Sequence, residues 1–233
     1  SRSSERDDCI RARALLVTVA MKQPQQIEKA EGKLGVLLPG LGAVATTFVA
    51  GCLLARKGLG DPVGSLTQLG TIRLGKRTDN RSPAIKDFVP LAELDDLVFG
   101  GWDIFPDNAY ESAAHAKVLA SRHLDPIRGE LESIVPMPGV FDPEDIRAFM
   151  KTSGCSRVVT VWCGSTEIYI EQTAVHQSIA AFEQGLLAND ASISNSQIYA
   201  WACLKEGIPF ANGAPNLTVD FPAAFDLARE TQT

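Results

Sequence analysis

The sequence predicts an α/β fold: a Rossmann-like, doubly wound and mostly parallel sheet with helices on both faces. Three observations point to it. Short apolar segments alternate with segments of helical periodicity, the first apolar segment leads through a glycine turn into a helix, and a later one at 157–163 also ends in a glycine turn. This alternation is typical of sheets whose strands are joined by helices packed on both faces.

The first predicted strand covers about residues 33–39. Its apolar run is short and continuous, as in a parallel strand covered on both faces. Gly40 and Gly42 follow, and Ala45 takes the third small position of a G-x-G-x-x-G/A pattern. In a dinucleotide-binding unit the first glycine permits the tight turn and the second lets the backbone approach a pyrophosphate. The third small residue lets the helix pack on the strand.

A helix over about 43–57 should follow, and the free N–H groups at its start would face phosphate oxygens. We interpret this junction as a dinucleotide site, although a glycine-rich turn without a ligand has the same pattern. One expected feature is missing. About twenty residues on, where a carboxylate usually binds the ribose, the chain has Thr67, Gln68, Thr71 and Arg73. The ribose of a nicotinamide cofactor would need another partner.

The pattern loosens over residues 58–90, which are rich in glycine, proline and basic side chains. They predict a long excursion of loops with one short strand near 64–68. A second core strand should cover 97–104, after which Asp107 is expected to cap a helix through about Leu119.

Four prolines within residues 125–144 exclude a long helix and predict an extended connector. The run at 157–163 is the clearest buried strand, and its carboxyl end is where ligands bind in open α/β sheets. The remaining elements are predicted in order as a helix at 145–152 before that strand, helices at 174–187 and 194–206, a short strand at 209–213 and a last helix at 221–230.

The composition excludes several classes of partner. The 233 residues are 45% hydrophobic, and 22 basic against 28 acidic side chains give a net charge of −6. This charge opposes non-specific binding to nucleic acid or to an anionic membrane surface. Because no apolar run is long enough to span a bilayer either, we expect no nucleic acid and no membrane as partner.

The cysteines and histidines indicate neither a disulfide framework nor a metal site. The five cysteines form no C-x-x-C pair, and the three histidines lack the spacing of metal ligands. We therefore expect no metal, and a reducing compartment such as the cytoplasm. His115 and His176 lie within helical patterns and are predicted to be surface or packing residues.

The first twenty residues differ from the rest. A polar stretch leads through Arg11 and Arg13 into a short apolar run that ends at Met21. The run resembles a signal peptide but is short and lacks a good cleavage site. We predict that the native chain starts at Met21, that residues 1–20 are a non-native or disordered extension, and that residues 21–233 form one NAD-binding Rossmann-like domain.

Five motifs, read in order, resemble the bacterial branch of the myo-inositol-phosphate synthases, and the likeness runs from about residue 33 to 229. The motifs are PGLGAVATT at 39–47, GTIRLGKR at 70–77, FGGWD at 99–103, WCGSTE at 162–167 and FANGAPN at 210–216. The resemblance implies NAD-dependent isomerisation of D-glucose 6-phosphate to 1D-myo-inositol 3-phosphate by oxidation, enolisation, aldol cyclisation and reduction. It also implies a cytoplasmic homotetramer that serves inositol and phospholipid biosynthesis.

By motif match the resemblance also implies a set of cofactor-binding residues. The turn would hold the pyrophosphate, Asp103 would bind a ribose, and two later turns would line the cofactor. The alternative for Asp103 is a helix cap, and for Ser165 and Thr166 it is ordinary turn chemistry. The full set is Gly40, Leu41, Gly42, Ala43, Val44, Asp103, Ser165, Thr166, Asn212 and Gly213.

Two departures from the family pattern affect the expected activity. A connector segment normally present after Asp142 is missing, and the chain stops at Thr233, before the lysines that the family uses for chemistry. The catalytic residues are therefore unknown. Arg73, Lys76 and Arg77 could meet a phosphate, although a basic loop on an acidic protein is more often surface or an oligomer contact. We expect weak or partial NAD binding, no turnover by this chain alone, and exposed apolar surface.

Two other functions remain open. The chain could be a catalytically silent nucleotide-binding paralogue that assembles with or regulates a full-length enzyme. An ordinary NAD-dependent dehydrogenase is less favoured because no Tyr-x-x-x-Lys pattern or histidine–acid pair is evident that could move a proton with the hydride.

Overall fold

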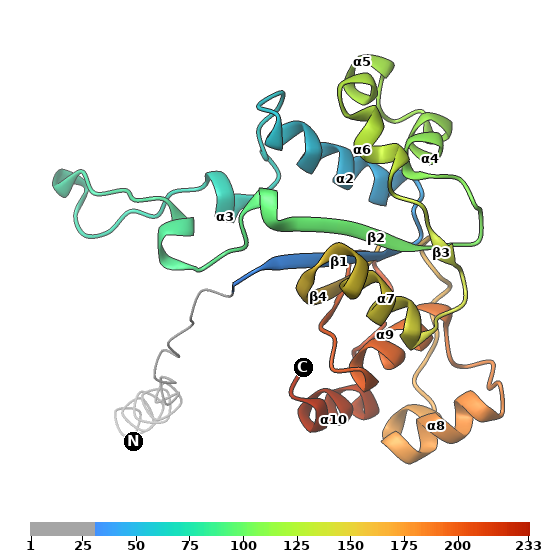
Figure 1. Ribbon diagram of the computed structural model, residues 1–233. Coiled ribbons are helices and arrows are strands. Elements are labelled where there is room, and N and C mark those ends of the chain that lie inside the picture. The colour runs from blue at the N-terminus through green and yellow to red at the C-terminus, as the bar shows by residue number, and fades with distance from the viewer. Residues whose placement is uncertain (1–30) are drawn as a thin grey trace, which may run out of the picture.

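The computed structural model describes residues 31–233, so the predicted extension at 1–20 and the predicted start at Met21 lie outside the described residues. Five parallel strands form one sheet in the order β3-β2-β1-β4-β5 (Figure 1). They are β1 (Lys33–Pro39), β2 (Leu97–Asp103), β3 (Met137–Pro138), β4 (Cys155–Trp162) and β5 (Phe210–Asn212).

Helices cover both faces of the sheet (Figure 1). One face carries α2 (Ala43–Arg56), α4 (Ala109–Ala116), α5 (Ser121–Leu124) and α6 (Arg128–Glu132). The other carries α7 (Pro143–Ser153), α8 (Ile179–Leu187), α9 (Asn195–Lys205) and α10 (Pro222–Thr231). The predicted doubly wound α/β fold is confirmed.

The central strand β1 explains why both faces need cover. Val36 and Leu38 pack into the core under α2, whereas Leu37 packs into the core on the α7 and α9 side. Because successive side chains of a strand point to opposite faces, a continuous apolar run needs helices on both. A third cluster joins α8, α9 and α10, and His176 packs there against Phe182 and Phe221, as a packing residue.

The order of the strands creates a switch point. From β1 the chain moves outward to β2 and β3, then returns across the sheet to β4 and β5 on the other side of β1. The loops that leave the carboxyl ends of β1 and β4 therefore depart in opposite directions. A crevice at this point is where open α/β sheets bind ligands.

Strand β3 is short, and this leaves one edge of β2 partly open. β3 pairs only with Trp102 and Asp103. Among the described residues, the part of β2 at 97–101 therefore has a partner strand on the β1 side alone.

Residues between α2 and β2 form an arm that projects away from the sheet (Figure 1). The predicted long excursion is confirmed, but the strand near 64–68 is wrong, since α3 (Leu66–Leu69) lies there instead. The rest of the arm contains short 3-10 turns, η1 (Arg77–Asp79), η2 (Ile85–Phe88) and η3 (Leu94–Asp96). Thr71 and Ala84 pair across the arm only as an isolated bridge, which does not extend into a strand.

Three other local predictions need correction. Asn108, not Asp107, caps α4, because its side chain accepts hydrogen bonds from the N–H groups of Tyr110 and Glu111. The region at 125–144 that was predicted as an extended connector instead begins with η4 (Asp125–Ile127) and α6, which continue from the end of α5, since a proline in a first turn loses no hydrogen bond. Finally, η5 (Ala174–Gln177) is separated from α8 by its cap, Ser178.

Candidate functional site

Gly40 makes the turn that leaves β1. Its φ is +84°, a conformation that favours glycine, and a Cβ added to it would lie 3.0 Å from the Cα of Gly164. The N–H of Gly40 donates to the carbonyl of Trp102 at 2.8 Å. The turn after β1 is thus fixed against the ends of both neighbouring strands.

Gly42 has the opposite surroundings, because a Cβ added to it would meet no atom within 4 Å. It is the N-cap of α2, where no side chain caps the helix and no acidic residue occupies the first turn. Ala43 and Val44 are exposed. Uncapped N–H groups and the positive end of the helix dipole therefore face open space, which suits a diphosphate.

Leu41 contributes differently from the other residues of the turn. Its side chain is fully buried in the core, and its N–H donates to Oδ2 of Asp103 at 2.7 Å. Leu41 therefore anchors the turn, and its N–H is already engaged by a carboxylate of the protein.

Asp103 ends β2 beside this turn. Its Oδ1 accepts the N–H of Phe105 at 3.0 Å, while Oδ2 accepts that of Leu41. Since a carboxylate oxygen can accept more than one hydrogen bond, both retain capacity for a ligand. The alternative of a helix cap is wrong, because Asn108 caps α4. The ribose contact stays a prediction.

Ser165 and Thr166 lie exposed in the loop that follows β4. The loop begins tightly packed: Cys163 N–H donates to the carbonyl of Pro39 at 3.3 Å, and a Cβ on Gly164 would lie 2.6 Å from the ring of Trp162. Through Gly164 the loop also contacts Gly40. The two hydroxyl groups are therefore held at the switch point, next to the glycine turn.

Asn212 and Gly213 shape the turn after β5. The Asn212 amide donates to the carbonyl of Asn216 at 2.5 Å and accepts the N–H of Ala214 at 2.9 Å. Gly213 donates to the carbonyl of Trp162, and a Cβ there would lie 2.7 Å from that oxygen. Both residues thus have a role in the turn itself, and contact with a cofactor stays a prediction.

Glu167 links the two later loops, a role that its sequence motif did not predict. Its carboxylate accepts the N–H of Ser196 at 2.9 Å and the hydroxyl of Ser196 at 2.5 Å. Asn216 donates to it at 3.3 Å and accepts the N–H of Glu167 at 2.9 Å. Ser196 in turn contacts the hydroxyl of Thr218. One indication of this role is present in the sequence, since Glu167 and Asn216 are the last residues of the fourth and fifth motifs.

Tyr199 on α9 packs against Trp102 and Trp162, near the carboxyl ends of β2 and β4, and acts as a hydrogen-bond donor. Burial, together with the charge of nearby Asp103, raises the pKa of Tyr199. The phenol donates to the carbonyl of Gly139 at 2.9 Å. It therefore stays protonated at neutral pH and braces the loop that follows β3.

Other reactive groups lie away from this edge. Burial raises the pKa of Cys203 to about 11, so that thiol in the core is a poor nucleophile. Lys205 pairs with Glu183 at 2.5 Å on the surface of α8 and α9. Within residues 31–233, no group of histidine, cysteine, aspartate and glutamate side chains could hold a metal ion, and no helix is long and apolar enough to cross a membrane.

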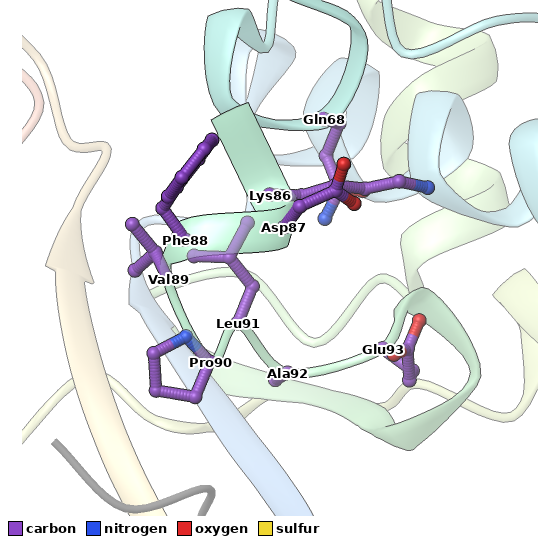
Figure 2. A pocket seen from close by; sticks show the side chains of 9 residues that line it. All are labelled: Gln68, Lys86, Asp87, Phe88, Val89, Pro90, Leu91, Ala92 and Glu93. Atoms are coloured by element: carbon purple, nitrogen blue, oxygen red, sulfur yellow. The ribbon is translucent and has the colours of Figure 1, made fainter. Parts of the chain in front are cut away.

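Two hollows in the surface also lie elsewhere. One of about 400 Å³ is formed by Gln68 and residues 86–93 of the arm, before β2 begins (Figure 2). The second, of about 490 Å³, runs along the open edge of β2 between Glu130 and Phe149. The glycine turn lines neither of them, so the candidate site is defined by the backbone N–H groups of the turn and not by either hollow. Arg73, Lys76 and Arg77 belong to the arm and not to the residues that surround the turn.

Comparison with known proteins shows which family the chain is similar to. An NAD-binding family model, described as myo-inositol-1-phosphate synthase, matches residues 34–144 and 143–233. Inositol-3-phosphate synthase 1 of Bacteroides thetaiotaomicron is 45% identical, over 88% of this chain and 54% of the relative. Inositol-3-phosphate synthase isozyme 1 of Arabidopsis thaliana is 33% identical, over 84% and 46%.

A solved structure supports the fold. The crystal structure of inositol-3-phosphate synthase from Caenorhabditis elegans matches with a TM-score of 0.77 at 24% identity, over 88% of this chain and 48% of that one. The chain spans about half the length of the curated relatives that it matches. The family model covers nearly all of the described residues and is a model of NAD binding. The chain therefore belongs to the myo-inositol-1-phosphate synthase family, and its cofactor is NAD.

Proposed function

We propose that this chain supplies the NAD-binding part of an inositol-3-phosphate synthase, an isomerase that converts D-glucose 6-phosphate to 1D-myo-inositol 3-phosphate. The observation that carries the proposal is the uncapped start of α2 beside Gly42, where a diphosphate can approach the backbone. Relatives with this activity in their names support the choice of reaction.

The residues of the chain would hold the cofactor and orient it. Backbone N–H groups of Ala43 and Val44 would bind the pyrophosphate, and Asp103 would accept hydrogen bonds from a ribose hydroxyl while it anchors Leu41. Ser165 and Thr166 would line the cofactor from the β4 side. When bound, NAD would supply the hydride acceptor and donor for the oxidation and reduction that precede and follow ring closure.

The enolisation and ring closure need more than this site offers. A general base and positioned cations must lie close to the sugar phosphate. Among the described residues around the turn, the Asp103 carboxylate already holds two N–H groups, and the Tyr199 phenol already donates to the carbonyl of Gly139. We therefore expect the 233-residue chain to bind NAD without converting glucose 6-phosphate by itself.

A second function is supported by the way the family model matches. The two matched pieces meet at residues 143–144, where the family resemblance implies a connector segment that this chain lacks. A chain altered there could be a catalytically silent paralogue that binds NAD and assembles with or regulates a full-length enzyme. Both proposals include NAD binding, and assay of inositol phosphate formation, alone and with a full-length synthase, separates them.

Assembly and location follow as further parts of the proposal. A homo-oligomer, a tetramer as the family resemblance implies, would cover apolar side chains of the arm such as Leu66 and Phe88, which are exposed. Placement in the cytoplasm, and a role in inositol and phospholipid biosynthesis, accord with the cysteine usage and with the relatives.

Substitution of Gly42 tests the cofactor site. Gly42→Val places a branched side chain in the open space at the start of α2, so we expect NAD affinity to fall by about tenfold or more, because the backbone can no longer approach the pyrophosphate. Calorimetric titration with NAD measures the effect, and circular dichroism checks that the fold persists.

Gly51→Ala is the matched control. Gly51 lies on the exposed side of the same helix with no atom within 4 Å of an added Cβ. This variant should bind NAD as the wild type does and unfold at a slightly higher temperature, since alanine favours a helix interior by about 0.5–1 kcal/mol. Equal NAD affinity of Gly42→Val and the wild type would remove the site from α2.

A further inference from the structure

We propose that Glu167 is the positioning residue of the cofactor site, because it fixes the loop that presents Ser165 and Thr166 beside the glycine turn. The inference rests on the proposed binding of NAD and deepens it. Neither the glycine pattern nor the comparisons assign a role to this carboxylate.

The loop is anchored at its first end by close packing of backbone and ring. A Cβ on Gly40 would lie 3.0 Å from the Cα of Gly164, and one on Gly164 would lie 2.6 Å from the ring of Trp162. Cys163 also donates to the carbonyl of Pro39 at 3.3 Å. The chain therefore leaves β4 in contact with the turn of β1.

Glu167 anchors the other end, two residues beyond the exposed hydroxyl of Ser165. Its side chain accepts the N–H and the hydroxyl of Ser196 at the start of α9, at 2.9 and 2.5 Å. Its backbone N–H donates to the Asn216 side chain at 2.9 Å, and the Asn216 amide returns a bond to the carboxylate at 3.3 Å. One residue thereby joins the loops after β4 and β5 to a helix.

The contacts of Glu167 with Ser196 are not needed to cap α9. α9 already has its own cap, since Ser194 accepts the N–H of Gln197 and the Gln197 side chain accepts that of Ser194. Ser196 and Thr218, which extend the network, are completely buried. A negative charge close to the N-terminal N–H groups of α9 is also favourable, so the carboxylate is held in one orientation.

The consequence for a ligand is preorganisation. Ser165 and Thr166 are exposed and lie between the two anchors, so their position depends on both. A loop that is already ordered loses little conformational entropy when a cofactor binds, whereas a released loop must be ordered by the cofactor itself. Loss of the Glu167 anchor should therefore weaken NAD binding without removing any residue that touches the cofactor.

The experiment compares wild type, Glu167→Ala, Glu167→Gln and a control, Glu171→Gln, whose side chain is exposed in the same segment. NAD affinity is measured by calorimetry below the unfolding transition of each protein. Amide hydrogen exchange of the peptide that spans residues 163–167 is measured without NAD and at saturation, and thermal unfolding is recorded separately.

We expect Glu167→Ala to weaken NAD binding by about tenfold and to speed exchange in 163–167 in the free protein, with protection regained at saturating NAD. Glu167→Gln, which keeps one acceptor oxygen, should lie between that variant and the wild type. Glu171→Gln should match the wild type. Ser196→Ala removes the hydroxyl donor and leaves the Ser194 cap, so it should also weaken NAD binding. It replaces Glu167→Ala as the test if that variant does not fold.

Three results would overturn the inference or its basis. If the Glu167 and Ser196 variants unfold at lower temperature but bind NAD with wild-type affinity, Glu167 is structural only and the positioning role is wrong. If affinity falls while exchange in 163–167 is unchanged, the carboxylate acts by a route other than loop order. If the wild type itself binds no NAD, the proposed function fails, and this inference fails with it.

Discussion

Asp103 shows how one side chain at the edge of a sheet can serve two tasks. Its carboxylate holds the N–H of Leu41, whose side chain is buried, and thereby fixes the turn that carries Gly40 and Gly42. The same carboxylate holds the N–H of Phe105. The residue thus braces the glycine turn whether or not it also contacts a ribose.

Replacement of Asp103 should cost both stability and cofactor affinity. We expect Asp103→Ala to lower the free energy of unfolding by about 1–3 kcal/mol, since the Leu41 N–H loses a charged acceptor. Asp103→Asn keeps one acceptor and should lose less. Denaturant unfolding measures the stability, and NAD titration measures the affinity.

Asp107→Ala is the control for this pair, because Asp107 is exposed and Asn108 caps α4. It should leave both quantities unchanged. An unaltered unfolding midpoint in Asp103→Ala would contradict the bracing role, and a marked loss of stability in Asp107→Ala would restore Asp107 as the cap.

The residues that could be predicted from sequence are those whose role is local. The need for glycine at positions 40 and 42 follows from a turn of the backbone and the start of a helix, both within a few residues. Glu167 contacts Ser196 and Asn216, which lie 29 and 49 residues further along the chain. Such pairings depend on where the topology brings two loops together, so no local pattern shows them.

At the scale of elements, the buried strands and most long helices could be predicted because burial on both faces gives continuous apolar runs. The predictions failed where neighbouring residues or two kinds of element fit the local sequence equally well. Asp107 directly precedes the true cap Asn108, and both types cap helices well. The short segment at 64–68, in which Leu66 is the one large apolar residue, suits either a strand or one helical turn, and the exposed arm offers no sheet for it to join.

The pairing of β1 with β2 depends on a glycine inside a strand. A Cβ on Gly101 would lie 2.1 Å from the carbonyl oxygen of Leu38, which belongs to the neighbouring backbone and cannot move aside cheaply. Gly101→Ala should therefore destabilise the protein by about 3 kcal/mol or prevent folding. Gly51→Ala, at an open helical position, should not destabilise it.

Urea unfolding of both alanine variants measures the difference. A Gly101→Ala protein as stable as the wild type would mean that β2 lies further from β1 than the ladder from Leu34 to Pro39 requires.

At the scale of the whole molecule, the motifs that carry the family resemblance gather at one edge. Those at 39–47, 99–103, 162–167 and 210–216 all contain or follow the carboxyl end of a strand, although they are far apart in sequence. The motif at 70–77 lies instead on the arm. A site of this kind could be predicted as a set of motifs, but its arrangement around β1 required the strand order.

The arm should govern self-association. Large apolar side chains are exposed along it, among them Leu66 at 73% and Phe88 at 56%. Leu66→Ser combined with Phe88→Ser should shift the protein towards smaller species in sedimentation velocity, because less apolar area is available for contact between copies. Thr67→Ser, at an exposed polar position of the arm, is the control.

An association that is unchanged in the double variant would place the contact between copies elsewhere. A wild type that sediments as a single monomer at all concentrations would contradict the proposal that this chain forms oligomers.

The last turn of α2, at the end of the helix away from the glycine turn, lies beside the open edge of β2. Arg56, in its last turn, donates to the carbonyls of Leu94 and Leu97 and lies over the ring of Phe99. A charged guanidinium in the hollow along an unpaired strand edge hinders a strand of another chain from pairing with it. Natural sheets use charged residues at their edges in this way to avoid aggregation. The two ends of α2 thus differ: its start leaves backbone N–H groups uncapped, whereas Arg56 in its last turn lies along the open edge of β2.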